Sequence, residues 1–466
     1  MTWPEEFAQR YRDLGLWRAR TLGSILRDSA EKWPEHTALV DGDRRWTYRE
    51  LDTWTDRVAG GLRGQGIGRG DRVLVHLPNI AEIVALSFAL FRVGAVPVYA
   101  LPQHRDTEIA HLRQAASPVA YFGSADLPEA DRVVGDGPDP ADVALMLLSG
   151  GTTGLPKLIP RTHNDYEYNL RASAELCGFD ENTRYLAALP VAHNFALGCP
   201  GVLGTFWAGG TVVLCTSADP ETAFPLIHRE KVNATALVPP LVLVWLDQAE
   251  HLGLRLLQVG GSRLKEEAAR RIRPELGCEL QQVYGMAEGL LNYTHLDDPD
   301  DVVFTTQGRP LSPLDEIRVV DGELQTRGPY TIRTYFGGDF DSFTEDGFYR
   351  TGDLVRLESG NLVVEGRKKD VINRGGDKIP VEEVENLLLG HPKVHDVAII
   401  GVPDEFLGER SCACVIARGE PPTRRDLVTY LTGLGVAAFK LPDQVRVLES
   451  FPRTAVGKVD RKALAL

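Results

Sequence analysis

The stretch Ser149-Gly-Gly-Thr-Thr-Gly-Leu-Pro-Lys157 decides how this chain is organised. An apolar run from Val143 to Leu148 precedes it and predicts a buried strand. Glycines let the backbone turn sharply and bring N–H groups close to an oxyanion, while the hydroxyl side chains and Lys157 add donors and a positive charge. No Gly-Lys-Ser/Thr follows, so this is not a Walker motif. The loop predicts a polyphosphate site, although a flexible surface loop has the same composition.

The bulk properties indicate a multidomain globular protein. With 466 residues, the chain is long enough for more than one domain, and its 43% hydrophobic and 25% charged residues are ordinary for a globular protein. The net charge of −14 argues against nucleic acid as the main partner. The most apolar helix-like run, Ile83 to Phe91, is too short to cross a membrane.

Cysteine usage and the N-terminus predict a cytoplasmic protein. Of the six cysteines only Cys412 and Cys414 are close in sequence, and no second pair or histidine cluster completes a zinc site. We therefore expect reduced thiols. The chain begins Met-Thr-Trp-Pro-Glu-Glu, which is not a signal peptide.

Strands and helices alternate through the first part of the chain. Residues 1–45 predict helical turns, and Thr47 opens a helix through a capping-box pattern. Val73 to Leu77 and Val96 to Ala100 predict buried strands, with Asn79 capping the helix between them. Such alternation predicts a mostly parallel α/β sheet, whose active site lies at the carboxyl ends of the strands.

The pattern changes after Pro310. Short strands and turns there predict a small β-rich subdomain, and a Lys/Arg-rich turn follows it. The predicted fold class is therefore α/β: a large N-terminal domain of α/β subdomains plus the β-rich subdomain, and a small α+β C-terminal domain. The predicted boundaries are 1–366 for the N-terminal domain, 367–370 for the basic segment that links the domains and 371–466 for the C-terminal domain.

Four further motifs carry chemistry. They are Tyr284-Gly-Met-Ala-Glu288, Tyr349-Arg-Thr-Gly-Asp353, Gly366-Arg-Lys-Lys-Asp370 and Pro452-Arg-Thr-Ala-Val-Gly-Lys458. An aromatic ring stacks on a base, and carboxylates hold Mg²⁺ or ribose hydroxyls. Taken singly, each motif also fits a plain turn, a solvated basic linker or a surface lysine.

Together with the glycine-rich loop, these motifs resemble the adenylate-forming superfamily over essentially the whole chain. The resemblance implies an ATP site between a large and a small domain, and it implies roles for particular residues. It places the phosphates at Ser149, Thr152, Thr153, Gly154 and Lys157; the adenine at Gly261, Ser262 and Tyr284; Mg²⁺ at Glu288; the ribose at Asp353 and Arg367; the hinge at Lys369; and the catalytic lysine at Lys458.

The implied chemistry agrees with the residue types. A carboxylate must attack the α-phosphate of ATP, and cations must offset the repulsion between the two anions. Mg²⁺ at Glu288 and the ammonium of Lys458 supply that charge. A thiol then attacks the acyl-adenylate, and a hinge at Lys369 exchanges Lys458 for a surface that admits a pantetheine arm.

The segment around His193 and Asn194 indicates the acid. Amino-acid-activating relatives carry an aspartate at the position of Asn194, which pairs with the α-ammonium, whereas a neutral amide bonds a carboxylate and an ortho hydroxyl. The segment resembles stand-alone aryl-acid AMP ligases of siderophore and nonribosomal peptide pathways, with His193 near the carboxylate. A capped turn is the alternative for His193-Asn194 alone. The resemblance gives the substrate-binding set as His193, Asn194, Phe195, Cys199, Gly260, Val283 and Leu291.

Two of these positions favour salicylate. Ligases for 2,3-dihydroxybenzoate resemble this chain but carry serine at the position of Cys199 and valine at that of Leu291. A buried 3-hydroxyl next to cysteine loses its partner, at a cost of ~1–3 kcal/mol. Other 2-hydroxyaryl acids, namely 2,3-dihydroxybenzoate and 3-hydroxypicolinate, are the alternatives, and Cys199 as a mere buried filler is the other interpretation.

The resemblance to aryl-acid AMP ligases implies that the acceptor is the phosphopantetheine thiol of an aryl carrier protein. We expect this carrier to be a separate protein, because no carrier segment follows Lys458. An aryl-CoA ligase is the alternative of the same fold. A non-catalytic binder of acyl-adenylates is the alternative from another class, and the presence of Lys458 and Glu288 argues against it.

Overall fold

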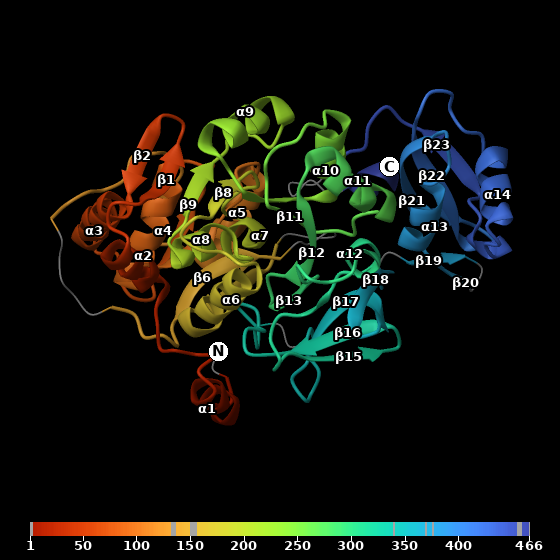
Figure 1. Ribbon diagram of the computed structural model, residues 1–466. Helices are drawn as coiled ribbons and strands as arrows, with labels where there is room; N and C mark the ends of the chain where they lie inside the picture. Colours follow the sequence, from red (N-terminus) through yellow and green to blue (C-terminus); the bar gives the residue numbers. More distant parts are fainter. Residues whose placement is uncertain are drawn as a thin grey trace. The chain divides into compact units, whose positions relative to one another are not determined.

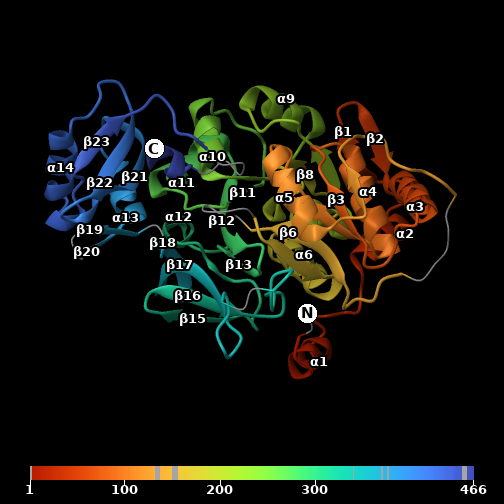
Figure 2. The same cartoon turned by 180° about the vertical axis from the view of Figure 1, so that it is seen from behind.

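The structure is a computed structural model, and it describes residues 3–131, 137–149, 156–338, 341–368, 371–374, 377–453 and 459–465. It divides into two compact units. The first comprises Met1–Gly151, Leu155–Ile317 and Thr326–Tyr349, and the second comprises chiefly Arg318–Gln325 and Arg350–Leu466. Figures 1 and 2 show the elements of both units from opposite sides.

Two sheets form the frame of the first unit. Its described strands make a nine-stranded sheet in the order β14 (Arg309–Pro310), β13 (Leu290–Tyr293), β12 (Glu279–Met286), β11 (Leu256–Gly260), β10 (Ala234–Leu237), β8 (Arg184–Ala187), β9 (Thr211–Leu214), β1 (Thr37–Asp41), β2 (Arg44–Thr47). They also make a five-stranded sheet in the order β5 (Ala120–Phe122), β3 (Arg72–Val75), β4 (Val96–Tyr99), β6 (Val143–Leu148), β7 (Leu158–Thr162). Both sheets are parallel in their centres and antiparallel at one or both edges.

The first unit also contains helices. They are α1 (Glu5–Asp13), α2 (Leu22–Lys32), α3 (Tyr48–Gly64), α4 (Ala81–Val93), α5 (Asp106–Ala116), α6 (His163–Leu176), α7 (Asn194–Gly198), α8 (Gly201–Ala208), α9 (Pro220–Glu230), α10 (Pro239–Asp247), α11 (Glu266–Leu276) and α12 (Asp300–Thr305). Helices α2, α3 and α4 pack against one another (Figure 1). Nearly every residue of α4 is buried. A helix that is apolar all round belongs in a core, which explains the long apolar run read from the sequence.

The second unit contains two smaller sheets. Strands β15 (Glu316–Val320), β16 (Glu323–Arg327), β17 (Tyr349–Glu358) and β18 (Asn361–Arg367) form one of them. The other contains β20 (Asp377–Pro380), β19 (Val371–Arg374), β22 (Gly408–Ala417), β21 (Val394–Asp404) and β23 (Gln444–Val447). Helices α13 (Val381–Leu388), α14 (Arg424–Gly433) and α15 (Arg461–Ala465) and the short η1 (Ala438–Lys440) complete it.

The predicted fold class is confirmed, with two local corrections. Thr47 caps α3 as predicted, because its side chain accepts from Glu50 N while Glu50 reaches back. Residues 1–45 were expected to be helical turns only, but β1 and the start of β2 lie there, and Leu39 is a buried strand residue. The tertiary pairing of β1 with β9 outweighs the local preference.

Asn79 does not cap α4, so that prediction was wrong. Ile80 occupies the cap position, and the Asp41 carboxylate accepts from Ala81 N instead. The buried Asn79 amide donates to the carbonyls of Ala187, Leu189 and Cys215, and its oxygen accepts from Val191 N. Asn79 therefore holds the segment that leads from β8 into α7.

The domain boundaries remain a prediction. The second compact unit begins before residue 367, because it includes residues 318–325 and 350–367 together with the C-terminal residues. The expected hinge residue Lys369 lies outside the described residues.

Candidate active site

Strand β6 delivers the glycine-rich loop at its carboxyl end. The two ends of the loop are joined, because Ser149 N donates to Lys157 O at 3.0 Å and Lys157 N donates to Ser149 Oγ at 2.9 Å. Thr152, Thr153 and Gly154 lie outside the described residues. The position of the loop fits the rule that ligands of α/β sheets bind at the carboxyl ends of strands.

Beside Lys157 lies a pair of tyrosines. The Lys157 ammonium is 4.8 Å from the centroid of the Tyr335 ring, and Tyr335 Oη donates to Glu288 Oε1 at 2.7 Å. Tyr349 Oη lies 2.9 Å from Tyr335 Oη. Burial and the adjacent Glu288 carboxylate raise the pKa of Tyr335, so its hydroxyl stays a donor. We call Ser149, Lys157, Glu288 and Tyr335 the phosphate end.

Glu288 fits the role of a Mg²⁺ ligand. Its side chain is buried, one oxygen accepts from Tyr335, and the other has no hydrogen-bond donor among the described residues. No cluster of three or more His, Cys, Asp or Glu side chains occurs in the part of the chain that the structure describes. Nucleotide-bound Mg²⁺ needs only one or two carboxylates, because phosphate oxygens and water complete its shell.

The turn that carries Glu288 is built around Gly289. This glycine has a φ of +98°, and a Cβ on it would lie 1.8 Å from Tyr330 O. Ile332 N donates to Glu288 O at 2.8 Å, and Thr331 Oγ1 donates to Gly289 O at 2.7 Å. The close approach of segment 330–332 therefore fixes the backbone on both sides of Glu288.

The residues expected around adenine lie at neighbouring strand ends. Gly261 follows β11 with a φ of +86°, and Ser262 next to it is exposed. Tyr284 lies near the end of β12 and is half-buried. Parallel pairing of β11 with β12 brings these ends to one edge of the sheet.

Asp353 and Arg367, the expected ribose contacts, lie in the second unit. They face each other across the antiparallel pair β17 and β18, and Arg367 Nε is 2.8 Å from Asp353 Oδ1. Asp353 is thus on a strand rather than in a plain turn. The guanidinium holds one carboxylate oxygen in a fixed direction.

His193, Asn194 and Phe195 begin α7. His193 Nδ1 accepts from Phe195 N at 3.2 Å, so the histidine caps the helix, and its expected contact with the substrate stays a prediction. Asn194 and Phe195 are buried, whereas His193 is half-buried.

Two glycines make room beside these residues. A Cβ on Gly260 would lie 3.0 Å from Phe195 Cζ and 2.7 Å from Val283 O. A Cβ on Gly285 would lie 2.3 Å from Leu291 Cδ2. Because Gly260 and Gly285 have no side chains, the Phe195 ring can pack directly against β11 and the Leu291 side chain directly against β12.

Cys199 contacts Asn194 twice. Its thiol donates to Asn194 O at 3.5 Å, and its sulfur accepts from Asn194 Nδ2 at 3.6 Å. Burial raises the pKa of Cys199 to about 12, so the group is a neutral thiol. We call His193, Asn194, Phe195, Cys199 and Leu291 the acid end.

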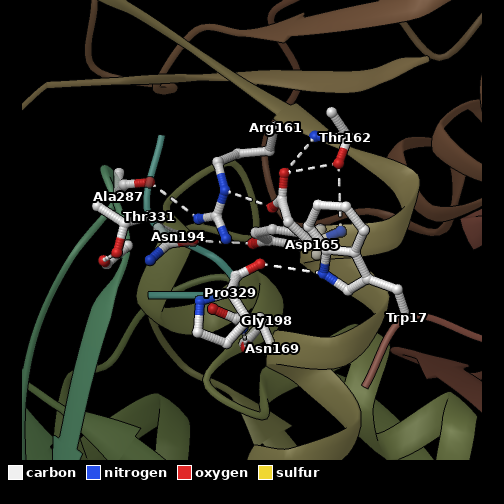
Figure 3. A network of polar contacts seen from close by, with 12 residues as sticks. Trp17, Arg161, Thr162, Asp165, Asn169, Asn194, Gly198, Ala287, Pro329 and Thr331 are labelled. Carbon is white, nitrogen blue, oxygen red and sulfur yellow. Dashed lines mark hydrogen bonds and ion pairs between the residues drawn. The ribbon is translucent and has the colours of Figure 1, made fainter. Parts of the chain in front are cut away.

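Tyr166 and Arg161 are contacts of the acid end that the sequence reasoning missed. Tyr166 Oη donates to Asn194 Oδ1 at 2.9 Å. The Arg161 guanidinium carbon lies 4.9 Å from the centroid of the Tyr166 ring, and Arg161 also bonds Asp165 and Ala287 (Figure 3). Residues 166 and 194 are far apart in sequence, so no local pattern predicts their contact.

The structure thus brings the phosphate-end residues together within the first unit. Of the acid-end residues, it joins His193, Asn194, Phe195 and Cys199 around α7, and it places Leu291 opposite Gly285 on the paired strands β12 and β13. Lys458 and Lys369 lie outside the described residues, so their roles remain predictions. Among the described residues, no helix is long and apolar enough to cross a membrane.

Comparison with known families identifies the class. The model of the AMP-binding enzyme family matches residues 26–137 and 125–336, and the model of the AMP-binding enzyme C-terminal domain matches 383–458. The chain therefore belongs to the AMP-binding enzyme family, and it is an adenylate-forming enzyme.

Individual relatives confirm the expected likeness to aryl-acid AMP ligases. The chain is 50% identical to a 2,3-dihydroxybenzoate-AMP ligase of Bacillus subtilis, over 99% of this chain and 96% of that protein. It is 44% identical to a salicyl-AMP ligase / salicyl-S-ArCP synthetase of Mycobacterium tuberculosis, over 99% and 93%.

Solved structures agree. The apo structure of MbtA from Mycobacterium smegmatis is 46% identical and covers 100% of this chain and 98% of its own, with a TM-score of 0.78. An o-succinylbenzoate coenzyme A synthetase (MenE) from Bacillus subtilis, in complex with ATP and a magnesium ion, is 25% identical over 95% and 99%, with a TM-score of 0.84.

Proposed function

We propose that the protein activates an aryl acid with ATP and transfers the acyl group to the phosphopantetheine thiol of a separate aryl carrier protein. A carboxylate oxygen of the acid attacks the α-phosphorus, and pyrophosphate leaves. The thiol sulfur then attacks the acyl carbon, and AMP leaves. Mg²⁺ at Glu288 supplies charge neutralisation on the phosphates when bound. Siderophore or related peptide assembly is the proposed setting, because the segment around Asn194 resembles the aryl-acid AMP ligases of such pathways. Relatives named pyochelin synthase PchD and salicyl-AMP ligase / salicyl-S-ArCP synthetase support this proposal.

One observation supports an aryl acid above all: the buried, neutral Asn194 in an apolar setting. An α-ammonium placed there would lose its water and gain no counter-charge from the amide. The Phe195 ring and the Leu291 side chain offer faces for a flat ring instead.

Salicylate is the proposed acid. Cys199 is a neutral, weakly hydrogen-bonding thiol, and Leu291 is buried, so a 3-hydroxyl would gain no good partner at this edge. The names of the relatives include both salicylate and 2,3-dihydroxybenzoate ligases. The alternative acids are therefore 2,3-dihydroxybenzoate and 3-hydroxypicolinate.

Acid-dependent exchange of labelled pyrophosphate into ATP tests this proposal. We expect exchange with salicylate and none with aliphatic amino acids. Absence of exchange with every aryl acid would overturn the proposal and favour a non-catalytic binder.

Free coenzyme A is the second candidate acceptor, because a relative 47% identical is named salicylyl-CoA synthase / salicylate adenylyltransferase. Thioester formation is measured with the purified carrier protein and with coenzyme A. We expect the carrier to react at least about tenfold faster in kcat/KM, which corresponds to about 1.4 kcal/mol. Equal rates would reject the carrier as the preferred acceptor.

A further inference from the structure

We infer that Tyr166 is a positioning residue that fixes Asn194 as a hydrogen-bond donor, so that the acid must present an acceptor oxygen at its ortho position. This inference rests on the proposed function and deepens it. It concerns how the site selects the ortho group.

The first step is the orientation of the Asn194 amide. Burial raises the pKa of the Tyr166 hydroxyl far above its usual range, so it keeps its proton. Asn194 is its hydrogen-bond partner, and a donating hydroxyl requires the amide oxygen to face it, at 2.9 Å.

The two contacts with Cys199 agree with the same orientation. Its proton goes to Asn194 O, so its sulfur is left to accept from Asn194 Nδ2 at 3.6 Å. A flipped amide would present Nδ2 to the tyrosine, whose oxygen would accept from it, and the hydroxyl proton would then have no acceptor among the described residues. The second N–H of Nδ2 has no acceptor among the described residues, and it is the group left for a ligand.

Tyr166 is itself held firmly. It is fully buried on α6, and a Cβ on Gly198 would lie only 2.6 Å from Tyr166 Oη. The Arg161 guanidinium lies against its ring and donates to Ala287 O at 2.9 Å, one residue before Glu288. Figure 3 shows Arg161 between Asp165 and Ala287, close to Asn194. Arg161 therefore joins the support of the acid end to the backbone beside the phosphate end.

An N–H donor from Asn194 at the ortho position of the acid is complementary to an ortho hydroxyl group. An ortho hydroxyl donates its proton to the neighbouring carboxylate of its own molecule, and its oxygen is then free to accept. An ortho amino group has its nitrogen lone pair delocalised into the ring and offers mainly N–H donors. Benzoate offers nothing and leaves the Asn194 N–H unpaired.

Tyr166→Phe is the first test. With the hydroxyl gone, the amide orientation is held by Cys199 alone, and the kcat/KM preference for salicylate over benzoate should fall about fivefold, the size of one net hydrogen bond. The KM for ATP should not change. In an Asn194→Ala background, Tyr166→Phe should leave the salicylate-to-benzoate ratio unchanged.

Tyr168→Phe is the matched control. Tyr168 is a buried tyrosine on the same helix, and its hydroxyl donates to Ser312 Oγ at 2.7 Å instead. It should leave the salicylate-to-benzoate ratio unchanged. A ratio that is equally affected by both substitutions, or unaffected by Tyr166→Phe, would overturn the inference.

Asn194→Asp tests the polarity directly and does not depend on the folding of the Tyr166 variant. It keeps an oxygen for Tyr166 and replaces the ligand-facing donor with an acceptor. The kcat/KM ratio of 2-aminobenzoate to salicylate should therefore rise about tenfold or more. An unchanged ratio would contradict the donor assignment. Wild-type protein without exchange on any aryl acid would instead overturn the proposed function, and this inference with it.

Discussion

The acid end and the phosphate end of the first unit are built from opposite materials. The acid end contains a neutral amide, a neutral thiol and apolar walls. The phosphate end contains the Glu288 carboxylate and the Lys157 ammonium around a tyrosine hydroxyl. Discrimination at the acid end thus depends on hydrogen-bond direction and shape, whereas the phosphate end works through charge. Substitutions at the two ends should consequently change different kinetic constants.

The largest expected effect comes from Lys458, which belongs to neither end. Lys458→Ala should lower the kcat for pyrophosphate exchange about a hundredfold or more, because its charge acts on the developing transition state. Nucleotide binding, measured by calorimetry, should be nearly unchanged. Near-normal exchange would reject the assignment of Lys458.

Glu288→Gln tests the phosphate end. Its neutral amide keeps an acceptor oxygen for Tyr335 but loses the charge, so kcat should fall about tenfold to a hundredfold and half-saturation by Mg²⁺ should require more metal. The KM for the acid should stay the same. Glu266→Gln on the surface of α11 is the control. An unchanged Mg²⁺ titration would argue against Glu288 as a ligand.

The double substitution Cys199→Ser with Leu291→Val tests which aryl acid the acid end selects. Serine gives the 3-hydroxyl a partner and valine makes space, so preference should move toward 2,3-dihydroxybenzoate by about tenfold, the size of one buried hydrogen bond. Both single variants are measured with the double, since their effects need not add. The KM for ATP should not move. No shift in the double variant would disprove the pocket assignment.

The smallest effect concerns the wall behind Leu291. Leu291 N donates to Tyr330 Oη, which donates to Asp315 Oδ2, and burial raises the pKa of Asp315 to about 7. The folded state therefore binds the proton more tightly than the unfolded chain, and the free energy of unfolding falls as pH rises from about 4 to about 7.

Asp315→Asn should remove this dependence. From pH 5 to pH 8 the free energy of unfolding of the wild type should decrease by about 1–3 kcal/mol more than that of the variant. Urea unfolding at both pH values measures it, with Asp301→Asn on exposed α12 as the control. Equal pH dependence in wild type and variant would show that Asp315 does not titrate in this range.

The sequence predicted many of the helices and strands correctly because these predictions depend only on neighbouring residues. The capping box at Thr47 and the apolar strand before the glycine-rich loop each depend on neighbouring residues, and these predictions agree with the structure. Asn79 was misassigned because its four hydrogen bonds go to residues over a hundred positions away.

The candidate site shows the same limit. Motifs and resemblance indicated Glu288 and Asn194, but not the tyrosines that orient them. Tyr335 reaches Glu288 and Tyr166 reaches Asn194 only through the fold. Neither tyrosine lies in a pattern that its own sequence neighbours reveal.

The most direct test of the account is steady-state pyrophosphate exchange on wild-type protein with salicylate, 2,3-dihydroxybenzoate and benzoate. We expect salicylate to have the highest kcat/KM, because its ortho oxygen accepts from Asn194 and it carries no 3-hydroxyl beside Cys199. Benzoate should be lower by about tenfold, the size of one unpaired buried group. A wild-type preference for 2,3-dihydroxybenzoate, or equal rates with benzoate, would contradict it.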